Sequence, residues 1–230
     1  PFFLYFAIPA PHTPILPTTE FIGKSNTNLY GDFVMQVDDV IGQIVRTLEH
    51  NGVKNRTIMI FTCDNGCSPR ADFEELKKVG HNPGYIYRGS KADIYEGGHR
   101  VPFILSWPDM VTYGSKSDEI ICTTDLMATV ADMLNYPLSD DSAEDSYSFL
   151  PVLTGKDYSI PIREATVHHS IQGRFAIRQG NWKLILWPGS GGWSSPVTEE
   201  ELKGLPEFQL YDLRADPSET NNLADKHPAK

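Results

Sequence analysis

The sequence has little of three features that would each point to a class of protein. It contains only three cysteines in 230 residues, too few for the disulfide framework of a small secreted domain. No apolar run reaches the roughly 20 residues of a membrane-spanning helix. The 20 Lys and Arg residues are outnumbered by 30 Asp and Glu, giving a net charge of −10. We therefore expect no membrane span and no nucleic acid among the partners.

Two further absences concern the cysteines and the start of the chain. Cys63 and Cys67 have no second Cys or His pair at zinc-finger spacing, so a zinc site is not expected. The apolar start, PFFLYFAI, is too short for a membrane helix and has no positively charged leader of a signal peptide. The chain begins with Pro1 at the edge of an apolar strand. We interpret this as a strand cut from a sheet and expect the chain to be a fragment.

The residues that are present predict an α/β protein with a sizeable core, since 40% are hydrophobic and 22% are charged. Apolar residues predict strands over 2–8, 57–62 and 101–108, with amphipathic helices over 30–48 and 123–134. A strand, a helix and a second strand in that order predict a parallel sheet with crossover helices.

The pattern changes after a Pro-, Ser- and Asp-rich linker at 136–162. Short alternating stretches with tight turns predict a small antiparallel sheet, followed by a short helix. These stretches are EATVHHSI, RFAIRQG, NWKLILWPG and FQLYDL. We place the domain boundary between residues 160 and 161.

Polar side chains follow the predicted parallel strands at the point where each one ends. Asp64 and Asn65 end the strand in TIMIFTCDNG, and His12 lies in the Pro-rich loop after the first strand. Asp-Asn-Gly is a common turn sequence, but the carboxyl ends of parallel strands also meet at one crevice. The long loop from 64 to 98 can bring Lys91 there.

This combination predicts a pocket for a tetrahedral oxyanion. The carboxylate of Asp64 and the amide oxygen of Asn65 are hard ligands suited to Ca²⁺ or Mg²⁺. Beside a bound cation, Lys91 would stabilise charge on the oxyanion, and His12 could protonate a leaving group. Each residue alone has a structural interpretation, as a turn, a hydrogen-bonding histidine or a surface lysine.

The order of these motifs resembles the second half of a type I sulfatase. This formylglycine-dependent family belongs to the alkaline-phosphatase-like superfamily. The resemblance rests on AIPAPHTPILP, IMIFTCDNG, GSKADIYEGGHRVPFILSWP, TTDLMATVADML, FAIRQGNWKLILWPGSGGW and QLYDLRADPSETNNLA, and covers nearly the whole chain. It implies the C-terminal part of a catalytic core over 1–160 and a small antiparallel subdomain over 161–230.

The resemblance also implies roles for four residues. Asp64 and Asn65 would be calcium ligands, with Mg²⁺ the less favoured ion. Lys91 and His12 would contact the sulfate group, and His12 would donate the proton to the departing alcohol.

The sequence departs from the family in its nucleophile. The family carries a Cys or Ser in C/S-x-P-x-R, which becomes formylglycine, whereas CSPR at 67–70 has the wrong register. The paired aspartates that complete the calcium site and an upstream Lys/His pair are also missing. The formylglycine and these groups are expected in a missing N-terminal half of the same protein, so this chain alone is predicted to be inactive.

Substrate contacts are predicted from polar residues of the long loop and the antiparallel sheet. Each candidate could bind a sugar hydroxyl or carboxylate, or be a surface side chain without a ligand. The candidates are His81, Arg88, His99, His168, His169 and Arg174. Trp182, Trp187 and Trp193 could stack on a sugar ring, although the first two are expected to pack the small sheet. The PGSGGW loop is similar to that of sulfatases acting on sulfated carbohydrates, including galactosamine 6-sulfate esters.

Two other functions stay open at this stage. One is a phosphatase or phosphodiesterase of the same superfamily, although such enzymes favour Asp/His clusters binding two metals. The other is a non-catalytic, sugar-binding protein, if Pro1 is the true start. The resemblance implies an exported or lysosomal location, and Asn55-Arg56-Thr57 is a glycosylation sequon. The expected ligand is a sulfated small molecule or glycan.

Overall fold

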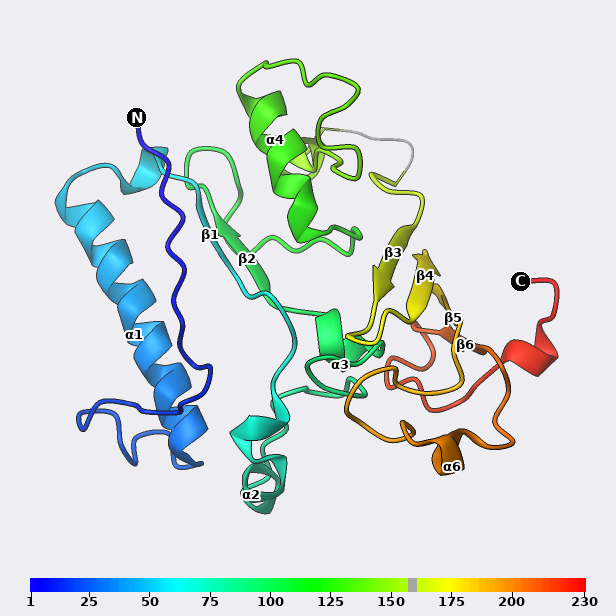
Figure 1. Cartoon of the computed structure of the whole chain (residues 1–230). Helices are drawn as coiled ribbons and strands as arrows, with labels where there is room; N and C mark the ends of the chain where they lie inside the picture. Colours follow the sequence, from blue (N-terminus) through cyan, green and yellow to red (C-terminus); the bar gives the residue numbers. More distant parts are fainter. Residues whose placement is uncertain (157–160) are drawn as a thin grey trace.

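The computed structural model describes residues 1–156 and 161–230. One long helix lies at one side of the molecule and a four-stranded sheet at the other (Figure 1). The helices are α1 (Leu29–His50), α2 (Phe73–Lys78), α3 (Glu96–His99), α4 (Leu126–Met133), α5 (Leu150–Thr154) and α6 (Glu199–Leu202). The strands are β1 (Met59–Thr62), β2 (Phe103–Ser106), β3 (Thr166–His169), β4 (Phe175–Gln179), β5 (Trp182–Ile185) and β6 (Gln209–Asp212). Short 3-10 turns are η1 (Lys54–Arg56), η2 (Pro69–Ala71), η3 (Thr123–Asp125) and η4 (Ala224–Lys226).

The helix predicted over 30–48 is confirmed as α1. The Asn28 side chain caps it by accepting hydrogen bonds from the amides of Tyr30 (3.1 Å) and Gly31 (3.2 Å), as expected of an N-cap residue. The buried carboxylate of Asp32 accepts the Gly23 and Ser25 amides at 2.7 and 2.9 Å. Asp32 therefore fixes the preceding loop against the first turn of the helix.

The strands predicted over 57–62 and 101–108 are confirmed as β1 and β2, but their pairing is antiparallel, with Thr62 opposite Phe103. The parallel sheet that we predicted from the strands over 2–8 and 57–62 therefore does not describe the pairing of β1 with β2. The reason is the long connection between them: the Gly66 amide donates to the Gly98 carbonyl at 2.9 Å. The chain thus enters β2 at the end where it left β1, and must run back along it.

Residues 2–8 are extended but are not assigned as a strand, because no hydrogen-bond ladder joins them to another described segment. They run beside α1 in the same direction as β1 (Figure 1). Their side chains are largely uncovered, with Phe3 at 85% exposure. The loops after residues 2–8 and after β1 leave on the same side of the molecule, as predicted.

The C-terminal meander is confirmed as an antiparallel sheet in the order β3-β4-β5-β6. Its buried face packs against Ile94 and Tyr95 of the long loop, together with Ala176, Ile185, Tyr211 and Leu213. Trp187 packs against this core as expected. The sheet therefore encloses the segment that follows Lys91.

The helix predicted over 123–134 is confirmed as η3 and α4. Asp125 is fully buried, accepts the amides of Cys122 (2.7 Å) and Tyr147 (2.9 Å), and forms an ion pair with Arg163. The domain boundary predicted at 160–161 adjoins residues 157–160, which lie outside the described residues, and it stays a prediction.

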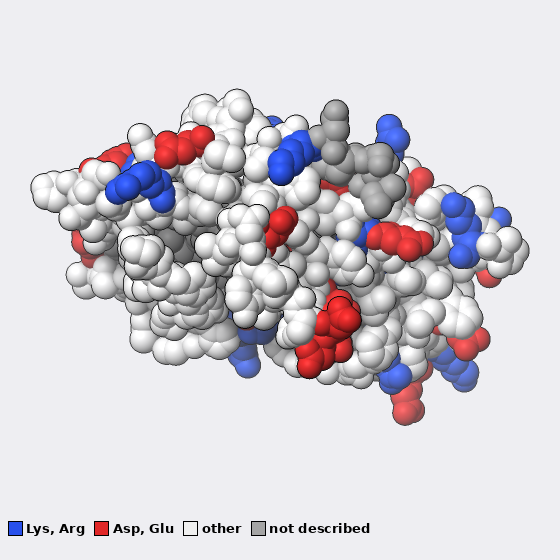
Figure 2. Space-filling view, turned by 90° about the horizontal axis from the view of Figure 1, so that it is seen from above, with Lys and Arg blue, Asp and Glu red and all other residues white. Residues whose placement is uncertain are grey.

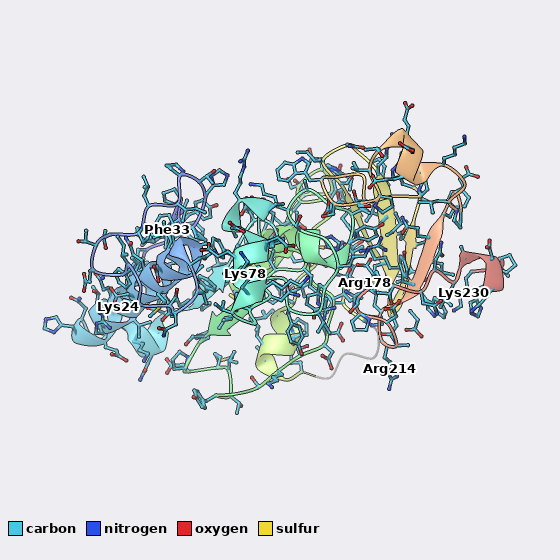
Figure 3. All side chains as sticks on the ribbon, turned by 90° about the horizontal axis from the view of Figure 1, so that it is seen from below. Lys24, Phe33, Lys78, Arg178, Arg214 and Lys230 are labelled. Carbon is cyan, nitrogen blue, oxygen red and sulfur yellow. The ribbon has the colours of Figure 1, made fainter. Side chains whose placement is uncertain are left out.

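Charged side chains of both signs lie on the surface. Acidic and basic side chains are scattered among uncharged ones on the face shown in Figure 2. Phe33 on α1 and the C-terminal Lys230 lie at opposite ends of the molecule (Figure 3). Across the residues placed in the structure, no helix combines the length and apolar character needed to cross a bilayer. The result is the mixed α/β fold with a small antiparallel sheet that the sequence predicted.

Candidate functional site

The turn that follows β1 is in close backbone contact with the loop that carries Lys91. A Cβ atom on Gly66 would lie 1.8 Å from the Gly97 carbonyl oxygen, so only glycine fits at this position. Asp64 is exposed and Asn65 is half-buried. The close approach of the two backbones therefore fixes the position of the Asp64–Asn65 pair relative to α3.

The oxygen atoms of this pair suit a hard cation. The Asn65 side-chain amide donates to the Gly66 carbonyl at 3.0 Å, which leaves its own carbonyl oxygen free to accept. Within 1–156 and 161–230, no hydrogen bond engages the Asp64 carboxylate and no group of three or more His, Cys, Asp or Glu is arranged around a metal position. The donor chemistry fits Ca²⁺, which takes six to eight oxygens, but this pair can supply only part of that set.

Lys91 lies beside the same turn. Its backbone amide donates to the Cys67 carbonyl at 2.9 Å, three residues along the chain from Asp64. The side chain is half-buried, and among the described residues its ammonium group forms no ion pair. A lysine held next to the Asp64–Asn65 turn is thus available to an anionic ligand.

His12 is exposed in the Pro-rich loop. Its Nδ1 donates to the Thr13 carbonyl at 2.8 Å, which leaves Nε2 free for proton transfer. The loop is attached to α1, since the Thr18 amide donates to the Gln36 side chain at 2.9 Å. No hydrogen bond of the described chain joins His12 to Lys91, so their meeting at one ligand stays a prediction.

Cys67, two residues after Asn65, is half-buried and carries a free thiol. Its Sγ donates to the Tyr30 hydroxyl at 3.2 Å. Burial raises the pKa of the Cys67 thiol. A thiol with a raised pKa is a poor nucleophile, which agrees with our rejection of the CSPR sequence as the nucleophile motif.

His99 and His168 lie against each other, although they are far apart in the sequence. Their ring centroids are 3.8 Å apart and the rings are tilted by 41°, while His99 Nε2 lies 3.2 Å from Glu96 Oε1. Burial lowers the pKa of His168 to about 2, and the neighbouring His99 and Lys183 also oppose its protonation. The structure therefore places the two rings in a neutral, half-buried pair, and their substrate roles stay predictions.

The two predicted arginines make structural contacts. The Arg88 guanidinium lies 3.9 Å from the centre of the Tyr95 ring and donates to the Glu219 carbonyl at 2.8 Å. The Arg174 guanidinium lies 3.5 Å from the centre of the Trp187 ring. These cation–π contacts stabilise the small sheet, and substrate binding by either arginine stays a prediction.

The last two candidates are open to solvent. His81 is exposed in the loop after α2. His169 is exposed at the end of β3, where its Nδ1 donates to the Ser170 carbonyl at 2.8 Å. Neither is brought to Lys91 by a hydrogen bond among the described residues.

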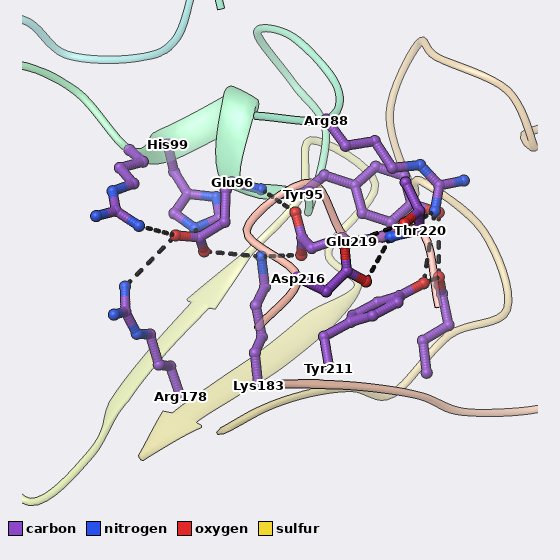
Figure 4. Close-up of polar contacts among 12 residues, drawn as sticks. Arg88, Tyr95, Glu96, His99, Arg178, Lys183, Tyr211, Asp216, Glu219 and Thr220 are labelled. Atoms are coloured by element: carbon purple, nitrogen blue, oxygen red, sulfur yellow. Dashed lines mark hydrogen bonds and ion pairs between the residues drawn. The ribbon is translucent and has the colours of Figure 1, made fainter. Parts of the chain in front are cut away.

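Sequence reasoning missed a buried charge cluster (Figure 4). Lys183 of β5 has no exposed surface, and its Nζ lies 3.1 Å from Glu96 Oε1 and 2.7 Å from Glu219 Oε1. The Glu219 carboxylate also accepts the Glu96 amide at 2.6 Å. Arg100 and Arg178 approach Glu96 Oε2 at 3.3 and 3.4 Å. We call these five side chains the charge cluster.

The electrostatics of the charge cluster follow from burial and from its cations. Burial alone would raise the pKa of Glu96, but the hydrogen bond from His99 and the charges of Lys183 and Arg178 hold it well below its usual range. Burial raises the pKa of Glu219. The alternation of β5 was the available signal, because it places Lys183 on the same buried face as Ile185.

Comparisons with known proteins assign the family. The sulfatase family model matches residues 1–136, and the model of the N-sulphoglucosamine sulphohydrolase C-terminal region matches residues 89–230. The first of these covers more than half of the chain.

Individual relatives agree. An N-acetylgalactosamine-6-O-sulfatase of Bacteroides thetaiotaomicron is 41% identical over 235 residues, covering 99% of this chain and 44% of the relative. Human steryl-sulfatase is 38% identical over 159 residues, covering 68% of this chain and 27% of the relative. The chain thus spans less than half the length of these curated relatives.

A solved structure agrees in fold. It comes from work on the metabolism of multiple glycosaminoglycans by Bacteroides thetaiotaomicron, and matches with a TM-score of 0.85 at 40% identity. The match covers 99% of this chain and 47% of that one. The family resemblance inferred from the motifs is confirmed: the chain belongs to the sulfatase family.

Proposed function

We propose that this chain is the C-terminal part of a calcium-dependent sulfatase that hydrolyses sulfate esters of amino sugars. Support for sulfate ester hydrolysis comes from family membership, and support for an amino sugar comes from the N-acetylgalactosamine-6-O-sulfatase relative. The observation that carries the proposal is the backbone hydrogen bond from Lys91 to Cys67, which holds the Lys91 backbone beside the Asp64–Asn65 turn, while its ammonium forms no ion pair among the described residues.

The residues of this chain would bind the sulfate group and move one proton. Lys91 would hold a sulfate oxygen and neutralise charge that builds up on it as the ester bond breaks. His12 would donate the proton from Nε2 to the departing alcohol oxygen. Asp64 and Asn65 would hold a calcium ion, which would add positive charge at the sulfate oxygens.

The remaining groups belong outside this chain. A formylglycine is expected to supply the nucleophile. Further acidic residues are expected to complete the set of calcium ligands. The same family resemblance favours an exported or lysosomal location. Family membership favours sulfate over phosphate, so the superfamily phosphatase is the less supported alternative.

Kinetics of the native protein containing this chain test the proposal. Lys91→Ala should lower kcat/KM for N-acetylgalactosamine 6-sulfate about 10²- to 10³-fold, as does the loss of a group that stabilises transition-state charge. Lys24→Ala replaces an exposed lysine near α1 and serves as the matched control, with unchanged kinetics expected. Equal activity of the two variants would contradict the role of Lys91.

His12 and the calcium site have separate readouts. His12→Ala should lower kcat/KM about 10²-fold or more for a sugar sulfate. The loss should be much smaller for 4-nitrophenyl sulfate, because its phenolate leaves without a proton. Calcium at 100 times its Kd should stabilise the protein by about 2.7 kcal/mol, and Asp64→Ala should abolish this shift in the unfolding midpoint. A calcium shift that persists in Asp64→Ala would refute the site assigned to Asp64.

A further inference from the structure

Trp193 is an exposed aromatic side chain on a buried loop. Its side chain is 50% exposed. The four residues before it (189–192) are all buried. A single exposed hydrophobic residue needs no explanation in itself. What distinguishes Trp193 is the way in which its backbone is held.

Asp93 holds the backbone of this loop. Its carboxylate is 3% exposed, and its Oδ1 accepts the amides of Trp193 at 2.7 Å and Ser194 at 3.0 Å. Its Oδ2 accepts the Ser90 amide at 2.7 Å and the Ser194 hydroxyl. Burial of a carboxylate is unfavourable unless hydrogen bonds satisfy it. Asp93 is satisfied here by the residues that position Trp193.

Glycines bring this loop directly onto the residue after Lys91. A Cβ atom on Gly192 would lie 2.6 Å from the Ala92 carbonyl oxygen and 2.3 Å from Asp93 Oδ1. The Ile94 amide also donates to the Ser190 carbonyl at 2.9 Å. The backbone of Trp193 is therefore fixed next to the segment that carries Lys91.

The turn between β3 and β4 is hydrogen-bonded to both of these segments. The Ile171 amide donates to the Ala92 carbonyl at 2.9 Å, and the Gln172 amide donates to the Gly191 carbonyl at 3.2 Å. The Gln172 side chain is exposed. Three segments distant in the sequence thus meet in one hydrogen-bonded unit, with an exposed indole and an exposed amide on it.

We propose that Trp193 is a stacking platform for the sugar ring of the substrate, positioned by Asp93 next to the sulfate-binding Lys91. The indole offers a large flat apolar surface, and a pyranose ring has one face of C–H groups that can pack on it. A rigid aromatic side chain provides this contact area with little loss of conformational entropy. Preorganisation of the loop reduces the cost of binding further. This inference rests on the proposed function, because it assigns the sugar subsite of the same reaction.

The test compares Trp193→Ala with Trp193→Phe and Tyr113→Ala in the native protein containing this chain. Tyr113 has a fully exposed side chain and is the control for loss of a surface aromatic. Methyl N-acetylgalactosaminide binding is followed by saturation-transfer NMR, and sulfate release from N-acetylgalactosamine 6-sulfate by kinetics. Inhibition by inorganic sulfate reports on the anion site alone.

We expect Trp193→Ala to raise the sugar Kd and the KM at least about tenfold, equivalent to about 1.4 kcal/mol of stacking. The inhibition constant of sulfate and kcat should change less than about threefold, because the anion site is intact. Trp193→Phe should recover most of the affinity, and Tyr113→Ala should behave as the native protein.

Three results would overturn the proposal: a native protein that does not bind the sugar, a Trp193→Ala variant that binds it unchanged, or an equal loss of sulfate binding. The proposed function has its own test, since absence of sulfate release from sulfated sugars refutes it. Sugar binding to the native and Trp193→Ala proteins would still decide the role of Trp193 in that case.

Discussion

Replacement of Lys183 by methionine should be among the most damaging single changes to this fold. Lys183 has no exposed surface and lies between Glu96 and Glu219, which are exposed by 1% and 0%. Methionine preserves the length of the side chain but leaves two buried carboxylates without their shared cation. Removal of one partner from a buried ion pair costs about 3–5 kcal/mol. We expect Lys183→Met to cost about 3 kcal/mol of unfolding free energy, at the lower end of this range. The reason is that Arg178 still contacts Glu96 and the Glu96 amide still donates to Glu219.

The measurement is the free energy of unfolding from urea titration of the native protein at pH 7. The matched control is Lys54→Met, which breaks an ion pair with Glu49 at the surface and should cost less than about 1 kcal/mol. The double variant Lys183→Met with Glu219→Gln should recover part of the loss, because it removes one uncompensated charge. The reasoning fails if Lys183→Met costs no more than Lys54→Met, or if the double variant is no more stable than the single one.

Two further predictions concern stability. Gly66→Ala should destabilise the protein by about 3 kcal/mol, because its Cβ meets the Gly97 backbone oxygen and backbone cannot move aside. Gly42→Ala in α1, whose Cβ meets only the end of a flexible side chain, should stabilise it by up to about 1 kcal/mol; similar urea midpoints for both would contradict this. The pKa of His168 is lowered from 6.5 to about 2, so the unfolded state binds more protons between these values. The unfolding free energy should fall by about 1–2 kcal/mol from pH 7 to pH 5, and His168→Gln should reduce that fall.

Local patterns were enough to predict most of the secondary structure. The apolar spacing of α1 and α4 and the alternation of the four C-terminal strands depend on neighbours a few residues away. The pairing of β1 with β2 was not predictable in this way. It depends on the Gly66–Gly98 hydrogen bond, which joins the two ends of a long polar loop.

The polar residues of the molecule also fall into two groups: those that the linear sequence indicated, and those that only the fold brings together. Asp64, Asn65, Lys91 and His12 were proposed from the linear sequence, because they lie at strand ends and in an ordered set of motifs. The charge cluster was missed because Glu96, Lys183 and Glu219 carry no local signature as a group. Each appears as an ordinary polar residue until the sheet folds over the loop.

The sequence by itself thus determined the family and the order of most helices and strands, and it supplied the residues proposed to carry the chemistry. The tertiary structure alone decided which distant segments touch: the contact between the tilted rings of His99 and His168, the charge cluster around Lys183, and the attachment of the Trp193 loop to Asp93. The physical reason is that a buried charge or polar group is unfavourable unless a specific partner pairs with it. That partner can lie a hundred residues away, where no periodicity or spacing points to it.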